Sequence, residues 1–395
     1  MKPHNIGIIG VGQTRYTARR DDATLPEIAK EAAVIALEDG GIEIKDVDAV
    51  VFSLALDALE GIESAERWCA GAVGAYGKPF IRVHTGGTTG GSAAHAGFFH
   101  IASGLFDCVL VVGAEKMGET PDAQNVLNRI FDPIYERAVA INAVNMCSFQ
   151  AVRHMKKYGT SEYHMALVSV RSRKNALRNP YAHIRGEITV EDVLNSRVIC
   201  YPLKLYDCCP RSTGGCAVVM ASERFIRRLD KKKVAWIRGV AGCTNSYFIG
   251  DRMDSSGIND YADTDGLLLA AKRAYRMAGI NNPRREISVA EIYAPFTSTE
   301  LAAVEALGFC EKGESGMCNE KGIFDMDGEI PINPSGGVLT ANPISVTALV
   351  RVAESAIQLM GKAEERQIEG VRTAVATGEG GSLQFYTVTV LSNRI

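Results

Sequence analysis

Long apolar runs and long basic runs are both missing from this sequence of 395 residues. A membrane-spanning helix needs about 18 or more consecutive apolar residues, and no such run occurs. The opening segment, MKPHNIGIIGVGQTRY, has too short an apolar stretch for a signal peptide. With 43 Lys and Arg against 46 Asp and Glu, the formal net charge of −3 gives no attraction to nucleic acid or to an anionic membrane. We therefore expect a cytoplasmic protein that binds neither.

The ten cysteines include no CxxC pair with a matching second pair, so no structural zinc site is expected in this chain. Cys208 and Cys209, in YDCCPRSTGG, are interpreted as small buried hydrophobes rather than as nucleophiles. All seven histidines precede residue 184. His95 and His100 lie five residues apart on a predicted helix, a poor spacing for two ligands of one ion. We expect no bound metal.

Two glycine-rich segments each lack a residue that nucleotide binding needs. GIIGVGQT has Arg15 where the third glycine of a dinucleotide-binding fingerprint belongs. TGGTTGGS, at 85–92, has no lysine of the kind that a phosphate-binding P-loop carries. Neither segment is therefore expected to bind a nucleotide.

What the sequence does have is a rhythm of strands and helices that occurs twice. In the first half it predicts strands over 6–11, 47–53 and 108–116 and helices over 25–42 and 90–104. In the second half the same order returns, with helices over 267–280 and within 333–361 and strands over 287–294 and 371–382. This repetition predicts a duplicated α/β fold with mainly parallel strands, divided into halves of residues 1–230 and 231–395.

A polar region of about 118–212 interrupts this rhythm. We interpret it as an irregular insertion that covers the carboxyl edge of the sheet. Ligands of α/β folds bind at that edge, so the insertion is expected to form one wall of the site.

Four segments carry a resemblance to a known family. KNALRNPYAHIRGEITVEDVLNS, YPLKLYDCCP, GFCEKGESG and INPSGG, in this order, resemble the thiolase superfamily in its sterol-carrier-protein-type and archaeal branch. The resemblance implies a duplicated fold of αβαβα layers, a homodimeric core and coenzyme A esters as substrates. In several members of this branch it also implies a small partner subunit of the DUF35 type, with a zinc finger and an OB-fold.

The catalytic positions of this family are occupied by other residue types. A thiolase places its nucleophilic cysteine at the N-terminus of the first-half central helix, and by register that cysteine corresponds to Gly87 in HTGGTTGGSAAHAGF. The two family histidines correspond to Tyr293 in EIYAPF and Asn342 in TANPIS, and a further one to Arg173. Because no histidine follows residue 183, a small shift of register restores neither of the first two.

Two interpretations remain open. In the first, the chain is an acyltransferase without a cysteine, in which the backbone N–H groups of Gly87 and of Gly380 or Gly381 bind an oxyanion. Tyr293 then donates a proton or hydrogen bond, Asn342 holds the thioester oxygen, and free coenzyme A attacks a β-keto thioester directly. Because members of the resembled branch include a thiolase that releases benzoyl-CoA and succinyl-CoA, the resemblance implies an aromatic substrate such as benzoylsuccinyl-CoA, which a pocket opened by Gly87 could admit. In the second, the chain is a catalytically silent subunit that binds coenzyme A beside an active thiolase paralogue.

Other polar residues near these positions are expected either to support the local fold or to contact coenzyme A. Thr85, Thr88 and Thr89 are expected to cap the helix and to bond within the turn, and Glu379 lies in the TGEGGS segment close by. We expect coenzyme A to contact Ser335, Gly336 and Arg173. Its phosphates could also meet a further group of basic residues, although a solvated surface is the simpler explanation for most of them: Arg171, Lys174 and Arg178.

Overall fold

A single nine-stranded sheet runs through the computed structural model, which describes residues 5–139, 141–253 and 260–395. The strands follow one another in space in the order β3-β2-β4-β7-β1-β8-β11-β10-β9. Their bounds are β1 (Ile6–Gln13), β2 (Ala49–Ser53), β3 (Phe80–Val83), β4 (Cys108–Glu115), β7 (Gly214–Ser222), β8 (Ala235–Thr244), β9 (Val289–Glu291), β10 (Thr373–Gly380) and β11 (Phe385–Ser392).

The strand order confirms the predicted duplication. β1 and β8 pair at the centre of the sheet, antiparallel, with Ile6 opposite Ile237. Moving outward from that pair, the first half continues β7-β4-β2-β3 and the second half continues β11-β10-β9. An isolated parallel bridge between Ala290 and Ile332 stands where the second half needs a counterpart of β3. The two halves therefore repeat one arrangement, whereas the division at residues 230 and 231 stays a prediction.

The prediction of mainly parallel strands is correct only at the two ends of the sheet. β3, β2 and β4 are parallel, as are β9 and β10, but the remaining neighbours pair antiparallel. The reason is visible in the second half, where residues 381–384 join β10 to β11. A connection that short permits only an antiparallel hairpin. β7 occupies the same place in the first half, beside β4.

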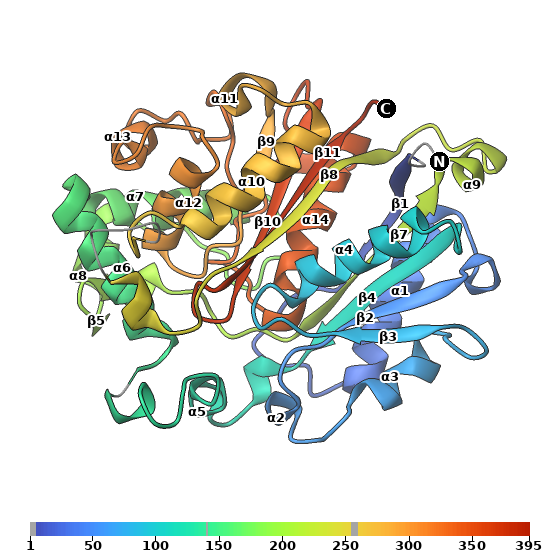
Figure 1. Ribbon diagram of the computed structural model, residues 1–395, viewed down its shortest axis with the longest axis horizontal. Helices are drawn as coiled ribbons and strands as arrows, with labels where there is room; N and C mark the ends of the chain where they lie inside the picture. Colours follow the sequence, from blue (N-terminus) through green and yellow to red (C-terminus); the bar gives the residue numbers. More distant parts are fainter. Residues whose placement is uncertain (1–4, 140, 254–259) are drawn as a thin grey trace.

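Two helices form a central layer between the halves of the sheet. α4 (Thr89–Ala102) and α14 (Ile344–Met360) pack on each other, and each contacts strands of both halves. Every α14 residue from Ser345 to Met360 is buried, as expected for a helix enclosed on all sides. α1 (Leu25–Gly40) covers the outer face of the first half and α10 (Asp265–Ala278) that of the second, which completes the αβαβα layers (Figure 1).

Local sequence signals set the ends of these helices. α1 begins after a capping box in which the Thr24 backbone N–H donates to the Glu27 carboxylate at 2.8 Å. α1, α10 and α14 end at Gly41, Gly279 and Gly361, each with φ between 66° and 76°. That left-handed conformation favours glycine, so the same stop signal closes corresponding helices in the two halves.

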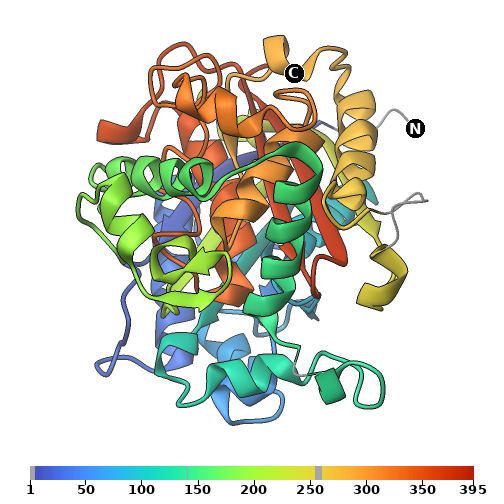
Figure 2. The ribbon, with the colours of Figure 1, turned by 90° about the vertical axis from the view of Figure 1, so that its left-hand side faces the viewer.

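The region of about 118–212 covers the carboxyl edge of the sheet as predicted, but it is largely helical rather than irregular. It lies between β4 and β7 and holds α5 (Ala123–Asn128), α6 (Ala143–Tyr158), α7 (Glu162–Ala176), α8 (Val190–Asn195) and the short pair β5 (Val198–Cys200) and β6 (Leu203–Lys204). Its green helices face the viewer in Figure 2. α6 and α7 pack against α12 (Thr297–Ala306), which fixes the insertion on the second half.

The remaining helices are short and lie at the periphery: α2 (Asp57–Glu60), α3 (Glu66–Ala72), α9 (Glu223–Arg228), α11 (Pro283–Glu286) and α13 (Ser315–Glu320). In the part of the chain that the structure describes, no helix combines the length and the apolar character needed to cross a bilayer. Residues 1–4, which begin the segment considered for a signal peptide, lie outside that part.

Candidate active site

A cavity of about 560 Å³ opens where the insertion meets the ends of the strands and the N-terminus of α4. Its lining includes Gly87, Tyr293, Asn342 and Gly381. These residues are up to 294 positions apart in the sequence, and the duplicated fold brings them together in one enclosed space. All four predicted catalytic positions therefore share a cavity, although their roles remain proposals.

Gly87 lies in the turn between β3 and α4, and there is no room for a side chain on it. A Cβ atom added to Gly87 would lie 2.7 Å from the Tyr293 hydroxyl oxygen and 2.6 Å from the backbone carbonyl oxygen of Glu379. Both separations are well below van der Waals contact. The tyrosine therefore occupies the space into which a nucleophilic side chain at residue 87 would project.

Tyr293 follows β9 and is held at the floor of the cavity. Its backbone N–H donates to the Thr377 hydroxyl at 2.9 Å, and its side chain is only 4% exposed. Burial raises the pKa of the phenol well above its ordinary value, and nearby Cys209 and Glu379 raise it further. The hydroxyl is therefore neutral near pH 7 and can donate a hydrogen bond or a proton.

Asn342 is oriented so that its amide N–H group faces the cavity. Its Oδ1 accepts a hydrogen bond from the Thr347 hydroxyl at 2.8 Å, and its Nδ2 donates to the Cys209 sulfur at 3.1 Å. Its backbone N–H donates to the Ser212 hydroxyl at 3.0 Å. With the carboxamide oxygen already occupied, the second N–H of Nδ2 is available to a carbonyl oxygen of a ligand.

Two glycine turns meet beside Gly87. A Cβ added to Gly380 would lie 2.6 Å from the Gly87 nitrogen, so the two backbones touch. Gly86 and Gly381 both have positive φ, at 64° and 59°, and a Cβ on Gly86 would come within 3.0 Å of the Gly381 nitrogen. This close approach is possible because neither turn carries side chains at these positions.

The threonines of the turn bond within the fold as predicted, but the predicted capping of α4 is wrong, because Thr88 at its N-cap makes no side-chain capping hydrogen bond. Thr85 and Ser92 share a hydroxyl hydrogen bond of 2.7 Å, and the Thr89 hydroxyl donates to the Gly86 carbonyl at 2.5 Å. Thr88 pairs with Thr387 of β11 at 3.0 Å. All three hydroxyls are therefore engaged in hydrogen bonds within the fold.

Three cysteines, Cys147, Cys208 and Cys209, also line the cavity. The sequence interpretation treated the last two as buried hydrophobes and did not place them at the site. Burial raises the pKa of the Cys209 thiol to about 12 and raises those of the other two thiols as well. Because a thiolate is the reactive form, these neutral thiols do not replace the missing nucleophile.

The structure does not support the predicted coenzyme A contacts of Ser335 and Gly336. Ser335 is 1% exposed, and its backbone N–H and hydroxyl donate to the Glu291 carboxylate at 3.0 and 2.8 Å. A Cβ on Gly336 would meet the Thr340 hydroxyl and the Ala176 methyl, at 2.6 and 2.7 Å. Both residues are enclosed by the fold and do not line the cavity. The family resemblance alone does not reveal this burial.

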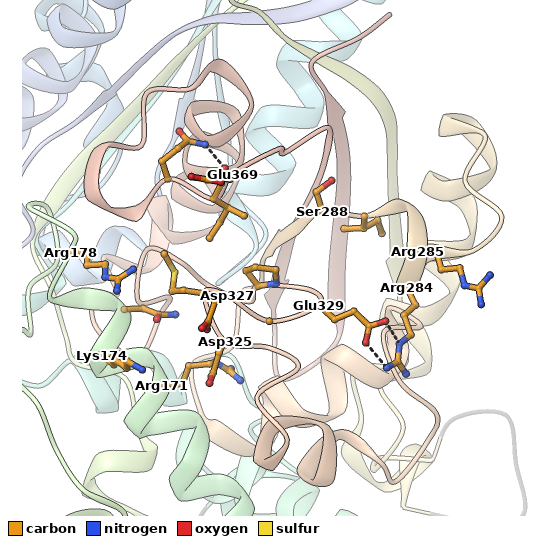
Figure 3. Close-up of a pocket in the computed structure, with 17 residues that line it drawn as sticks. Arg171, Lys174, Arg178, Arg284, Arg285, Ser288, Asp325, Asp327, Glu329 and Glu369 are labelled. Atoms are coloured by element: carbon orange, nitrogen blue, oxygen red, sulfur yellow. Dashed lines mark hydrogen bonds and ion pairs between the residues drawn. The ribbon is translucent and has the colours of Figure 1, made fainter.

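The basic residues of α7 also lie elsewhere. Arg173 is half-buried over the Tyr206 ring, 5.4 Å from its centroid, and is not among the residues that line the cavity. Its three neighbours instead line a separate, open cleft of about 840 Å³: Arg171, Lys174 and Arg178. Figure 3 shows them on one side of that cleft, facing Asp325 and Asp327. The helical spacing of these residues, rather than their sequence proximity to Arg173, decides which side they face.

Two arginines that the sequence interpretation missed lie at the mouth of the cavity. Arg197 and Arg211 are exposed, line the cavity and form no ion pair among the described residues. Arg211 donates to the Thr120 carbonyl at 3.1 Å. They flank the YPLKLYDCCP segment. Their position beside this family segment is the sequence signal by which they could have been found. Planar guanidinium groups in this position suit a phosphate ligand.

Within the described ranges, no group of three or more His, Cys, Asp or Glu side chains is arranged to hold a metal ion.

The chain matches two family models that together span most of its length. The thiolase N-terminal domain matches residues 6–223, and the thiolase C-terminal domain-like family matches residues 251–393. Acetyl-CoA acetyltransferase of Methanothermobacter thermautotrophicus is 32% identical over 96% of this chain and 97% of its own. Sterol carrier protein 2 of Bos taurus is 31% identical over 96% of this chain and 71% of its own length.

Two further relatives bear on the site. Benzoylsuccinyl-CoA thiolase subunit BbsB of Thauera aromatica is 27% identical over 95% of this chain and 94% of its own. A solved structure described as Ltp2-ChsH2(DUF35) aldolase superimposes with a TM-score of 0.83 and 26% identity, covering all of this chain and 99% of that one. The family models, the relatives and the duplicated five-layer architecture agree, and the chain belongs to the thiolase family, in its sterol-carrier-protein-type branch.

Proposed function

We propose that this chain makes or breaks the carbon–carbon bond between Cα and Cβ of a coenzyme A thioester without forming an acyl-enzyme, in a reaction of the aldol type. The observation that carries the proposal is the Tyr293 hydroxyl lying where a side chain on Gly87 would project. A thiolytic cleavage must hand an acyl group to a nucleophile. An aldol cleavage releases a neutral aldehyde or ketone and needs no nucleophile at all.

The proposed reaction balances without a further reactant. The proton of a β-hydroxyl group is removed, the bond between Cα and Cβ breaks, and the electron pair moves to Cα to give a thioester enolate. A proton then adds to Cα, so the products are a carbonyl compound and a shorter acyl-CoA. Tyr293 and Asn342 are two neutral donors suited to the enolate oxygen, and backbone N–H groups of Gly87 and of Gly380 or Gly381 could add to them.

Similarity to an aldolase complex supports this choice. The Ltp2-ChsH2(DUF35) aldolase has the same fold along its whole length. Its DUF35 component also supports a small partner subunit of that type for this chain. A homodimeric core is supported by β3, an edge strand of the sheet on which Ile81 is exposed, and by the exposed Phe99 of α4, a helix that contacts β3. We place the complex in the cytoplasm.

Acyl-CoA binding is assigned to the mouth of the cavity. Arg197 and Arg211 would hold phosphates of coenzyme A, and the thioester would reach inward to Asn342 and Tyr293. This assignment replaces Ser335, Gly336 and Arg173, which do not line the cavity.

A second candidate is direct thiolysis, in which free coenzyme A attacks a β-keto thioester. The similarity to benzoylsuccinyl-CoA thiolase subunit BbsB favours benzoylsuccinyl-CoA as its substrate, giving benzoyl-CoA and succinyl-CoA. A cavity of about 560 Å³ has room for an aromatic acyl group. If the chain is instead a silent subunit, an active thiolase paralogue would supply the chemistry.

The need for free coenzyme A separates these candidates. The complex would be purified from its host with its natural partners and incubated with 3-hydroxy-3-phenylpropanoyl-CoA in the absence of free coenzyme A. Release of benzaldehyde and acetyl-CoA, measured by mass spectrometry, is the expected result. Turnover of benzoylsuccinyl-CoA only when free coenzyme A is added would favour thiolysis. An accompanying thiolase chain with an intact cysteine, together with no loss of activity in a Tyr293→Phe variant, would favour the silent subunit.

A further inference from the structure

Glu379 is a buried carboxylic acid inside the candidate active site. It is the penultimate residue of β10, lines the cavity and is 6% exposed. Its side chain forms no hydrogen bond or ion pair among the described residues. Buried carboxyl groups are normally paired, so an unpaired one at a reaction cavity is a candidate for proton transfer.

The register of β10 directs Glu379 away from the central helices. Its neighbour Gly378 packs against Thr88 of the central layer, where a Cβ would lie 2.3 Å from the threonine hydroxyl. Successive residues of a strand face opposite sides, so Glu379 faces the insertion. There it pairs across the sheet with Tyr386 and lies near Cys147 of α6, whose pKa its charge raises.

We propose that Glu379 carries the proton to and from the α-carbon of the acyl-CoA in the cavity that it lines. The inference rests on the proposed enolate chemistry. As a carboxylate, Glu379 takes the proton from Cα while the electron pair of that C–H bond moves into the enolate. The resulting acid exchanges its proton with water that enters the cavity and returns one to Cα.

The charges around the group set the pH at which it can act. Burial raises the pKa of Glu379 to about 8, and the Arg252 guanidinium opposes part of that rise. The other titratable groups near it are the Cys147 thiol and the phenols of Tyr261, Tyr293 and Tyr386, and all of their pKa values are raised so that they are uncharged near neutral pH. The active carboxylate form therefore becomes dominant only as the pH rises past about 8.

Hydrogen–deuterium exchange at Cα tests this role without requiring cleavage. The purified complex would be incubated in D₂O with acetyl-CoA and with propionyl-CoA, and deuterium in the acyl group would be followed by mass spectrometry across pH 6 to 10. We expect exchange by the unmodified complex to rise through an inflection near pH 8. Glu379→Gln should lose about 100-fold or more of the rate together with that inflection, and Glu379→Asp should keep part of both.

The controls separate this inference from the proposed function. Glu305→Gln changes another buried carboxyl, one bonded to Ser315 and His154 outside the cavity, and should exchange normally. If the unmodified complex exchanges and a folded Glu379→Gln variant does so at the same rate, the role of Glu379 is wrong while the enolate chemistry stands. If the unmodified complex binds acyl-CoA but exchanges nothing, the enolate chemistry and the role of Glu379 both fail.

Discussion

The Tyr293 hydroxyl and the α-carbon of Gly87 are complementary in shape: a single added carbon on the glycine would lie 2.7 Å from the phenolic oxygen. The thiolase resemblance treats the two positions as separate losses, a missing cysteine and a missing histidine. The structure links the two positions sterically. A tyrosine can enter this position because residue 87 has no side chain, and a nucleophile cannot be restored at 87 while the tyrosine remains.

This complementarity predicts non-additive effects on stability. Gly87→Ala should destabilise the protein by about 1–3 kcal/mol, the usual effect of overpacking. In a Tyr293→Phe background the hydroxyl is gone, while the contact with the Glu379 carbonyl and a looser one of 3.3 Å with the ring Cζ remain, so the same alanine should cost about 1 kcal/mol less. Urea unfolding of the two single variants and the double variant measures the coupling. Strictly additive free energies would show that the two residues do not compete for space.

Restoring one family residue alone should not restore thiolase chemistry. Gly87→Cys places its sulfur against the tyrosine and should be inactive in thiolysis. Gly87→Cys combined with Tyr293→His makes room at the hydroxyl and should react faster with iodoacetamide than the single variant does. Equal labelling of the two thiols, followed by peptide mass spectrometry, would contradict the steric account.

The two side-chain donors should affect turnover more than folding. Tyr293→Phe and Asn342→Ala remove the hydrogen bonds proposed for the enolate oxygen and should each lower turnover at least tenfold, with thermal unfolding nearly unchanged. A Thr85→Val variant, which alters a turn hydroxyl bonded to Ser92, is the matched control and should keep its activity. Unchanged rates in both donor variants would leave the silent-subunit interpretation as the better one.

The sequence predicted the fold and the core of the site better than it predicted the ligand contacts. Helix ends follow from local signals that act within a few residues, such as the glycines that end α1, α10 and α14. Gly87, Tyr293 and Asn342 could be located by register because each belongs to a segment of its own. Ser335 could not be placed from the sequence, because its burial against Glu291, away from the lining of the cavity, depends on packing from another part of the chain. The role of Glu379 depends on which face of β10 it occupies, and TGEGGS gives no apolar alternation to show that.

Glu379 should also reduce stability as the pH rises. Its pKa is raised on folding from an ordinary value near 4.5 to about 8, so the folded state holds a proton that the unfolded chain releases. Stability is therefore lost progressively between these two pH values. Glu379→Gln should remove this loss and be more stable than the unmodified protein at pH 8, by up to a few kcal/mol at about 1.4 kcal/mol per pKa unit. Urea unfolding at pH 5, 6.5 and 8 measures the difference, which should grow with pH.

Glu305 is a buried carboxyl whose pKa is shifted in the direction opposite to that of Glu379. Burial disfavours its charge, but His154 and Ser315 outweigh this and hold the pKa of its carboxyl below the ordinary value. Its contribution to stability is present above the unfolded pKa and is lost as the pH falls. Glu305→Gln should therefore be less stable than the unmodified protein at pH 6.5 to 8. A Glu379→Gln variant that showed the same sign as Glu305→Gln would contradict the unpaired, buried state of Glu379.

The two arginines at the cavity mouth should govern binding rather than chemistry. Because Arg197 and Arg211 lie near the entrance rather than beside Tyr293, Arg197→Ala and Arg211→Ala should each raise KM for acyl-CoA about fivefold or more and leave kcat within about twofold. The effect should shrink at high salt, since screening already weakens contacts between exposed charges. Arg178→Ala removes a cation from the separate cleft of Figure 3 and should leave both constants unchanged. If Arg178→Ala instead raised KM while the other two did not, coenzyme A would enter along α7, as the order of residues in the sequence suggested.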